Sequence, residues 1–117
     1  MEDELVASGR FVRIEMTAVP SGQVRAVTVG FVDDGASVLV AAGSPDAVWA
    51  RSLLADPACH VRIGDRSFDA VAELLDVGEH ARAVRELILR YGTPAETLGH
   101  GPSFRLRPAA DQAETAP

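Results

Sequence analysis

The residues best suited to chemistry lie in one short segment. Residues 43–46 read Gly-Ser-Pro-Asp and stand just ahead of Trp49, the only tryptophan. A chain that leaves a strand through glycine and enters a helix exposes free backbone N–H groups, which can hold a phosphate or a carboxylate. Ser44 could add a hydroxyl donor, whereas Asp46 would repel an anion. The segment therefore predicts either an anion site or a plain capped helix, with Trp49 either in a pocket wall or in the core.

The remaining polar candidates are scattered along the chain. His60 faces Asp69 in a predicted hairpin, either as an orienting pair for acid–base chemistry or as a surface cross-strand pair. His80 and His100 share no metal-ligand spacing with His60, so no metal site is predicted. Arg25 is either part of a solvated strand face or a phosphate partner. The sequence has no Walker loop, nucleophile elbow or dinucleotide fingerprint.

The elements that would position these residues are mostly strands. Residues 10–18 alternate, with Val12, Ile14 and Met16 on one side, which is typical of a half-buried strand. Further strands are predicted at 23–32, 36–42, 58–63, 66–75 and 103–108, with a hairpin loop at 33–35. Two helices are predicted, one from Ser44 as N-cap to about residue 55 and one over 77–91 that ends at Gly92.

The hairpin formed by residues 58–63 and 66–75 allows a prediction of its register. Pairing Ile63 with Arg66 across a turn at 64–65 places Val61 opposite Phe68. The same register places Cys59, the only cysteine, on the apolar side, so we expect a packed core thiol.

The predicted order β-β-β-α-β-β-α-β, joined mostly by hairpins, favours a mainly β fold: a six-stranded antiparallel barrel with two helices. Residues 1–108 are expected to form a single domain, with a frayed acidic end over 1–8. Residues 109–117 lack apolar periodicity and are predicted to be a disordered tail.

Bulk composition narrows the range of partners. The 117 residues carry a net charge of −6, which argues against a nucleic-acid or anionic-membrane binder. No apolar run approaches the roughly 20 residues of a membrane span. The first four residues, Met-Glu-Asp-Glu, lack the basic region of a signal peptide, so we expect a cytoplasmic protein.

One order of residues along the chain matches a known pattern. It consists of Ser21, Gly22 and Arg25, then Ala42, Gly43, Ser44 and Pro45, then Trp49, Leu53 and Pro57, and a closing segment over 104–108. Over roughly residues 9–108 this order resembles the deazaflavin-dependent nitroreductase family, within the flavin-binding split β-barrel group. The resemblance implies a split barrel, usually a homodimer, that binds a deazaflavin coenzyme (factor 420), while relatives use FMN, haem or fatty acids. It also implies an oxidoreductase that passes hydride to a small molecule such as a quinone, a nitro compound or an activated double bond.

The resemblance also implies roles for single residues. The residues predicted to meet the phosphate tail are Ser21, Gly22 and Arg25. The residues predicted to line the deazaflavin groove are Gly43, Ser44 and Trp49. Two residues are predicted to be catalytic: Ser44, and Tyr91, which lies near the family's substrate-facing tyrosine. The chain departs from the family at Gln23, Val24 and Asp46, where basic residues are usual. Each lost cation removes a phosphate contact worth about 1.5–3 kcal/mol.

These departures leave three functions open. The first is a reductase that uses the deazaflavin coenzyme or FMN. The second is a repurposed split barrel whose groove binds another small molecule or does chemistry without a cofactor. The third is a dimerising protein without catalysis.

Overall fold

A computed structural model gives the structure of the chain and describes residues 2–18, 21–92, 98 and 100–109. Its elements in chain order are α1 (Glu2–Ala7), β1 (Val12–Thr17), β2 (Val24–Val29), β3 (Val32–Asp34), β4 (Ser37–Ala41), α2 (Val48–Ala55), β5 (Ala58–Ile63), β6 (Arg66–Leu74), α3 (Val77–Tyr91) and β7 (Ser103–Pro108). None of the helices in this part of the chain is long and apolar enough to cross a membrane.

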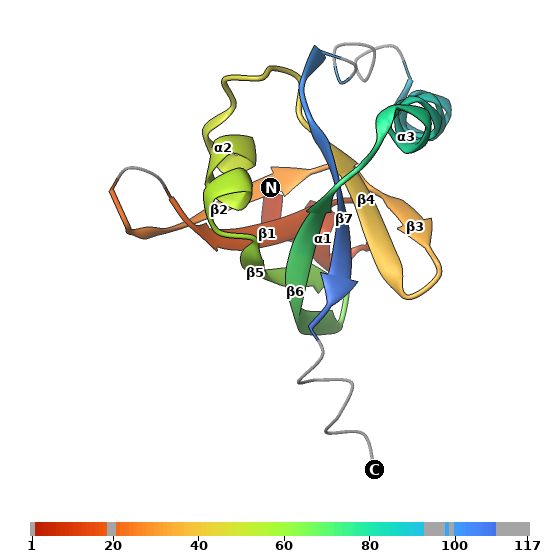
Figure 1. The fold of residues 1–117 in the computed structure, drawn as a ribbon. Coiled ribbons are helices and arrows are strands. Elements are labelled where there is room, and N and C mark those ends of the chain that lie inside the picture. The colour runs from red at the N-terminus through yellow and green to blue at the C-terminus, as the bar shows by residue number, and fades with distance from the viewer. Residues whose placement is uncertain (1, 19–20, 93–97, 99, 110–117) are drawn as a thin grey trace.

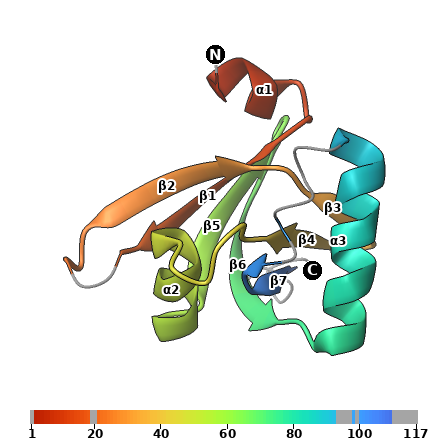
Figure 2. The ribbon, with the colours of Figure 1, turned by 90° about the horizontal axis from the view of Figure 1, so that it is seen from above.

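The strands form a single curled sheet (Figure 1). Their order is β2-β1-β5-β6-β7-β4-β3, and every neighbouring pair is antiparallel. The two edge strands, β2 and β3, are consecutive in the chain and joined only by Gly30 and Phe31. The sheet therefore curls round on itself and stays open between its edges, as Figure 2 shows from above. This confirms the mainly β, antiparallel split barrel.

The described residues hold seven strands and three helices, where six and two were predicted. The expected strand over 23–32 is broken at Gly30 and Phe31. There the Phe31 N–H donates to the Tyr91 hydroxyl at 3.0 Å, and an added Cβ on Gly30 would come within 2.8 Å of a carbon of the Tyr91 ring. The predicted loop at 33–35 is also wrong, because Asp33 and Asp34 belong to β3. The turn consists instead of Gly35 and Ala36, with Gly35 at a φ of 70°.

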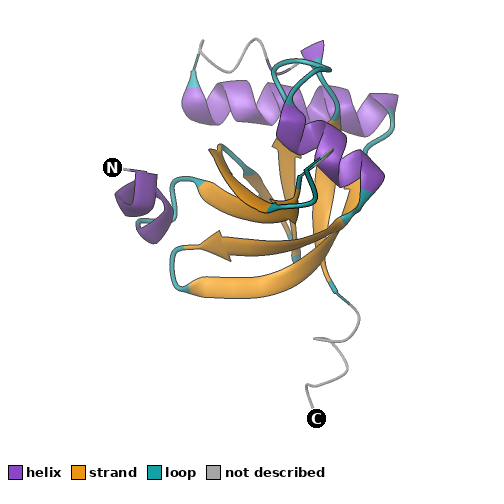
Figure 3. Ribbon diagram, turned by 90° about the vertical axis from the view of Figure 1, so that its left-hand side faces the viewer, coloured by secondary structure: helices purple, strands orange, loops and turns teal. Residues whose placement is uncertain are grey.

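The acidic N-terminal segment is helical rather than frayed. Its α1 helix docks on the turn between β5 and β6, where the Gly64 N–H donates to the Val6 carbonyl at 2.7 Å. The Val6 side chain is buried, which gives this short helix an apolar anchor. Figure 3 shows α1, beside the N-terminus, apart from the other two helices.

The core lies inside the curl of the sheet and continues beneath α3. Val38 and Val40 of β4 face the interior, whereas Leu39 and Ala41 face outward and are covered by α3. Because β4 is buried on both faces, its sequence is an unbroken apolar run after Ser37 rather than an alternating one.

Of the two longer helices, α3 agrees with its prediction and α2 begins later than predicted. Helix α3 has the predicted bounds, with Asp76 as N-cap and Gly92, at a φ of 86°, as C-cap. Helix α2 starts at Val48 rather than next to Ser44, and its N-cap Ala47 provides no side-chain hydrogen bond. Ser44 instead closes a separate turn, in which its Oγ accepts from the Asp46 N–H at 3.1 Å.

The hairpin of β5 and β6 has the predicted register, with Ile63 opposite Arg66 and Val61 opposite Phe68. Cys59 is buried, as expected for a core thiol. At the end of β7 the Ala109 N–H donates to the Asp69 carbonyl at 2.9 Å, so the expected tail does not begin at residue 109. The rest of that tail, 110–117, lies outside the described residues.

Candidate functional site

A pocket of about 430 Å³ lies between α2 and the paired strands β1 and β2. Its lining residues are Met16, Ala18, Ser21, Arg25, Ala26, Val27, Val48 and Trp49. Three of the predicted coenzyme-binding residues, Ser21, Arg25 and Trp49, thus come together in one place. The volume falls within the range of about 300–1,000 Å³ that is usual for small-molecule sites.

The pairing of β1 with β2 places Arg25 at this pocket. Met16 and Arg25 stand opposite each other, and cross-strand partners share a face of the sheet. Met16 is buried in the core, so Arg25 lies at the open end of the interior face. Its guanidinium donates to the Gln23 Oε1 at 3.0 Å, and no described carboxylate forms an ion pair with it. The cation is therefore available to an anionic ligand.

The turn between β1 and β2 carries Ser21. It is closed by hydrogen bonds from the Gly22 N–H to the Ala18 carbonyl and from the Ala18 N–H to the Gln23 carbonyl, both at 2.8 Å. Gly22 has a φ of 75°, a conformation that L side chains rarely adopt. Gly22 is absent from the pocket lining, so within the described structure it shapes the turn that presents Ser21.

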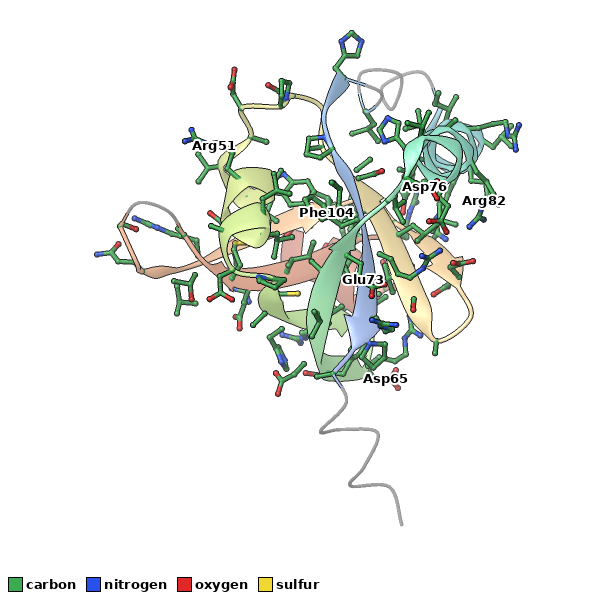
Figure 4. All side chains as sticks on the ribbon, in the orientation of Figure 1. Arg51, Asp65, Glu73, Asp76, Arg82 and Phe104 are labelled. Carbon is green, nitrogen blue, oxygen red and sulfur yellow. The ribbon has the colours of Figure 1, made fainter. Side chains whose placement is uncertain are left out.

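Trp49 forms one wall of the pocket and also packs against the core. Its ring lies 6.0 Å from that of Phe104, at an interplanar angle of 55°. Figure 4 shows Phe104 in the interior beside β7 and Arg51 on the outer side of α2, away from the strands. Trp49 is thus both a residue packed against the core and a wall of the pocket. A rigidly packed indole offers an apolar surface to a ligand ring.

The N-terminus of α2 faces the same pocket through Val48 and Trp49. The first backbone N–H groups of a helix have no partner within the helix and carry its positive end. Here no side chain caps them, and the first turn has no acidic residue. The prediction of Ser44 as N-cap would place Asp46 in the first turn; Asp46 instead lies ahead of the helix, which begins two residues after it.

Gly43 and Ser44 lie elsewhere, against the segment that precedes β7. The Ala42 N–H donates to the Pro102 carbonyl at 2.9 Å, and a Cβ on Gly101 would come within 2.7 Å of the Ser44 carbonyl oxygen. Neither Gly43 nor Ser44 lines the pocket. Their predicted groove and catalytic roles have no support from this arrangement and stay predictions.

Tyr91 lies toward the other end of β2. Its hydroxyl donates to the Arg10 carbonyl at 2.7 Å and accepts from the Phe31 N–H at 3.0 Å, while its ring covers Gly30. At about 3.3 Å per residue, Gly30 is about 16 Å along the strand from Arg25. In the described structure Tyr91 fastens the junction of β2 and β3, and its predicted substrate-facing role stays a prediction.

The sequence reading did not identify the apolar floor of the pocket. Its residues include Met16, Ala18 and Val27. The alternation of β1 already indicated that Met16 faces the interior. Placing Met16 at the pocket also requires the register between β1 and β2, which sets it opposite Arg25. The pocket thus combines an apolar floor and an indole wall with one guanidinium, one hydroxyl and a helix N-terminus. This set fits a flat aromatic ligand that carries an anionic group.

None of the described residues that line the pocket is a histidine, aspartate or glutamate. The lining residues can bind and orient a ligand and stabilise its charge. The reaction chemistry would then come from the bound ligand.

The sequence matches the model of a protein family described as F420H(2)-dependent quinone reductase, over residues 9–94. No curated protein matches the chain.

Three solved structures illustrate the likeness of fold. The haem storage protein HutZ of Vibrio cholerae is 21% identical with a TM-score of 0.72, over 92% of this chain and 87% of that one. An F420-H2 dependent reductase, FDR-A, is 21% identical with a TM-score of 0.70, over 84% and 94%. A putative pyridoxamine 5'-phosphate oxidase from Listeria innocua is 16% identical with a TM-score of 0.66, over 92% of both chains.

At these identities the three structures establish the split-barrel fold and nothing about activity. The family match covers well over half of the 117 residues and confirms the resemblance seen in the sequence. The chain belongs to the F420H(2)-dependent quinone reductase family.

Proposed function

We propose that this protein is a deazaflavin-dependent reductase that binds the reduced coenzyme in the pocket between α2 and the β1–β2 pair. The family match supports the coenzyme class. The observation that carries the assignment to this pocket is the convergence of Ser21, Arg25 and Trp49 beside the uncapped start of α2. When bound, the coenzyme supplies the hydride.

The chain's own residues would hold and orient the coenzyme. Trp49 and the apolar floor, including Met16 and Val27, offer surfaces against which a ring system can stack and exclude water. Arg25, Ser21 and the backbone N–H groups that open α2 would meet an anionic group of the tail. We further propose that the acceptor is a small organic molecule, with a quinone first among the candidates, and that the protein acts as a homodimer in the cytoplasm.

Titration of the coenzyme into the protein, read by the fluorescence of Trp49, tests this proposal. Arg25 is exposed, so we take the low end of the range for a hydrogen bond to a charged group, about 1.5 kcal/mol. The variant Arg25→Gln should then bind the coenzyme about ten-fold more weakly.

Arg51→Gln is the matched control, because it removes an arginine from the outer side of α2. It should leave the affinity within about two-fold, since Arg51 does not line the pocket and an exposed charge that makes no contact with a ligand contributes little. Equal weakening by both variants would show that net charge, and not this pocket, governs binding. Absence of quenching at about 100 μM coenzyme would remove the proposal.

One observation favours a second candidate, FMN. Arg25 is the only cationic side chain that lines the pocket among the described residues, so the site offers little to a long polyanionic tail. A less anionic flavin would lose less from the missing basic residues. Parallel titrations of FMN and the deazaflavin coenzyme decide between the two by the order of their affinities.

A further inference from the structure

A second group of polar side chains lies on the outer face of the hairpin formed by β5 and β6. His60 Nδ1 is 2.9 Å from the Asp69 Oδ1, and His60 Nε2 is 2.7 Å from the Ser67 Oγ. The imidazole therefore joins a carboxylate on one side to a serine hydroxyl on the other. This is the connectivity by which a carboxylate orients a histidine and the histidine takes a proton from a serine.

We propose that Ser67, His60 and Asp69, none of which lines the coenzyme pocket, form a hydrolytic site that takes activated esters of small carboxylic acids. Ser67 is the nucleophile, His60 the general base and Asp69 the positioning residue that holds the imidazole.

The strand register holds these groups in place. His60 and Asp69 are direct cross-strand partners, and Ser67 lies two residues before Asp69, on the same face of β6. Strand β5 is also paired with β1 on its other side, where Glu15 stands opposite His60. Glu15 forms an ion pair with Arg13, which leaves Asp69 as the carboxylate bonded to the imidazole.

A hollow adjoins the imidazole and the carboxylate, and a cation lies beside the nucleophile. A pocket of about 430 Å³ is lined by His60 and Asp69 but not by Ser67, and its apolar lining includes Val24, Ala58 and Val71, together with Met16, which it shares with the coenzyme pocket. Arg62 is the cross-strand partner of Ser67, and no described carboxylate forms an ion pair with it. A guanidinium on this face can stabilise the oxyanion that forms when a serine attacks an ester carbonyl.

A second histidine–serine contact shows what sets the first one apart. His80 Nδ1 is 2.7 Å from the Ser103 Oγ, but Ser103 is only 1% exposed and no described carboxylate bonds His80. Ser67, in contrast, is exposed and belongs to a complete chain of three groups.

The reaction has two balanced halves. The Ser67 Oγ bonds to the ester carbonyl carbon, its proton passes to the His60 Nε2, and the leaving alkoxide or aryloxide departs with that proton. Water then attacks the acyl-serine, giving its proton to His60. Release of the carboxylic acid restores the Ser67 hydroxyl, so one ester and one water become an acid and an alcohol.

The test uses 4-nitrophenyl acetate and the full-length protein. We expect release of 4-nitrophenolate, with the transient acetyl group located on Ser67 by mass spectrometry of proteolytic fragments. Ser67→Ala should lower the rate at least about ten-fold, since general-base chemistry of this kind contributes about 10²–10⁴-fold. Ser8→Ala, which removes another exposed serine, should not change it.

Asp69 is tested by a pair of variants. Asp69→Asn should lower the rate, and Asp69→Glu should restore part of it, because a carboxylate near His60 Nδ1 is what the geometry requires. The site is refuted if Ser67→Ala keeps its rate within two-fold of the wild type, or if the acetyl group is found on another residue. Coenzyme binding should be the same in all these variants, so a failure here is separable from a failure of the proposed reductase.

Discussion

The buried thiol of Cys59 makes folding stability fall at alkaline pH. Burial raises the pKa of Cys59 from an ordinary value of 9.0 to about 11, and the negative charges of Asp69 and Asp56 add to the rise. In the folded state the Sγ–H also donates to the Ala70 carbonyl at 3.7 Å, a contact that a thiolate cannot make. Raising the pH through the range between these two pKa values should therefore destabilise the folded protein.

The size of the effect follows from the difference between the two pKa values. Well below pH 9 the thiol is almost fully protonated in both states, so it contributes almost no pH dependence to the stability. Between pH 9 and 11 the unfolded chain releases the proton while the folded chain keeps it, and unfolding becomes easier as pH rises. A shift of two pKa units corresponds to a loss of about 2 kcal/mol by pH 11, which approaches about 3 kcal/mol at higher pH.

Urea unfolding between pH 8 and 10.5 measures this loss, with Cys59→Ala as the matched control. The variant lacks the titrating thiol, so its stability should fall less steeply with pH than that of the wild type. In the folded wild type, thiol labelling at pH 8 should also be about 100-fold slower than in urea, because the thiolate fraction differs by that factor. Parallel pH curves for the two proteins, or equally fast labelling of the folded and unfolded states, would refute the reasoning.

Three further substitutions test the packing and the turns. Leu87→Ala should cost about 2–5 kcal/mol in chemical unfolding, because Leu87 is fully buried between α3 and β4; a cost below 1 kcal/mol would contradict this packing. Asp76→Ala should lower the thermal midpoint through a loss of about 1 kcal/mol, since it removes the side chain that accepts from the Glu79 N–H at 2.8 Å, whereas Asp76→Ser should keep most of the stability. Gly101→Ala should destabilise by about 1–3 kcal/mol, because the added Cβ would come within 2.6 Å of the Ala42 carbonyl oxygen; an unchanged thermal midpoint would mean that this close approach is absent.

Most of the barrel could be predicted from local patterns. Strand β1 alternates, and the hairpin of β5 and β6 has one register that keeps Cys59 and Val61 with apolar partners, so both followed from the sequence. Helix α3 followed from the helical spacing of its apolar residues and from Gly92, but Val77, one of those apolar residues, is 87% exposed. Its buried face is centred on Leu87, because the position of β4 decides which side of the helix is covered.

Some of the errors came from contacts between residues that are distant in the chain. The break between β2 and β3 depends on the ring of Tyr91, which is some 60 residues away in the chain and lies against Gly30. The α1 helix is anchored through the turn at Gly64. The late start of α2 has a local cause: Ser44 can cap a helix or close a turn of its own, and propensity alone does not choose between them.

The candidate site was predicted in part. The family resemblance predicted Ser21, Arg25 and Trp49 as coenzyme-binding residues, and the structure brings these three residues together. The floor of the pocket depends on the register of β1 against β2, which places Met16 opposite Arg25 and has no local signature comparable to that of the β5–β6 hairpin. The catalytic role of Tyr91 was predicted from its position along the chain. That position does not show which groups its hydroxyl contacts in the folded protein.

The location of the bound coenzyme is the most direct test of the central claim. Nuclear magnetic resonance of the labelled protein, recorded while the deazaflavin coenzyme is added, reports which residues the coenzyme touches. We predict the largest shifts at the Trp49 indole N–H, the Arg25 guanidinium and the backbone amides that open α2. Shifts centred instead on Phe31 and Arg90, in the separate pocket near α1, would contradict the account.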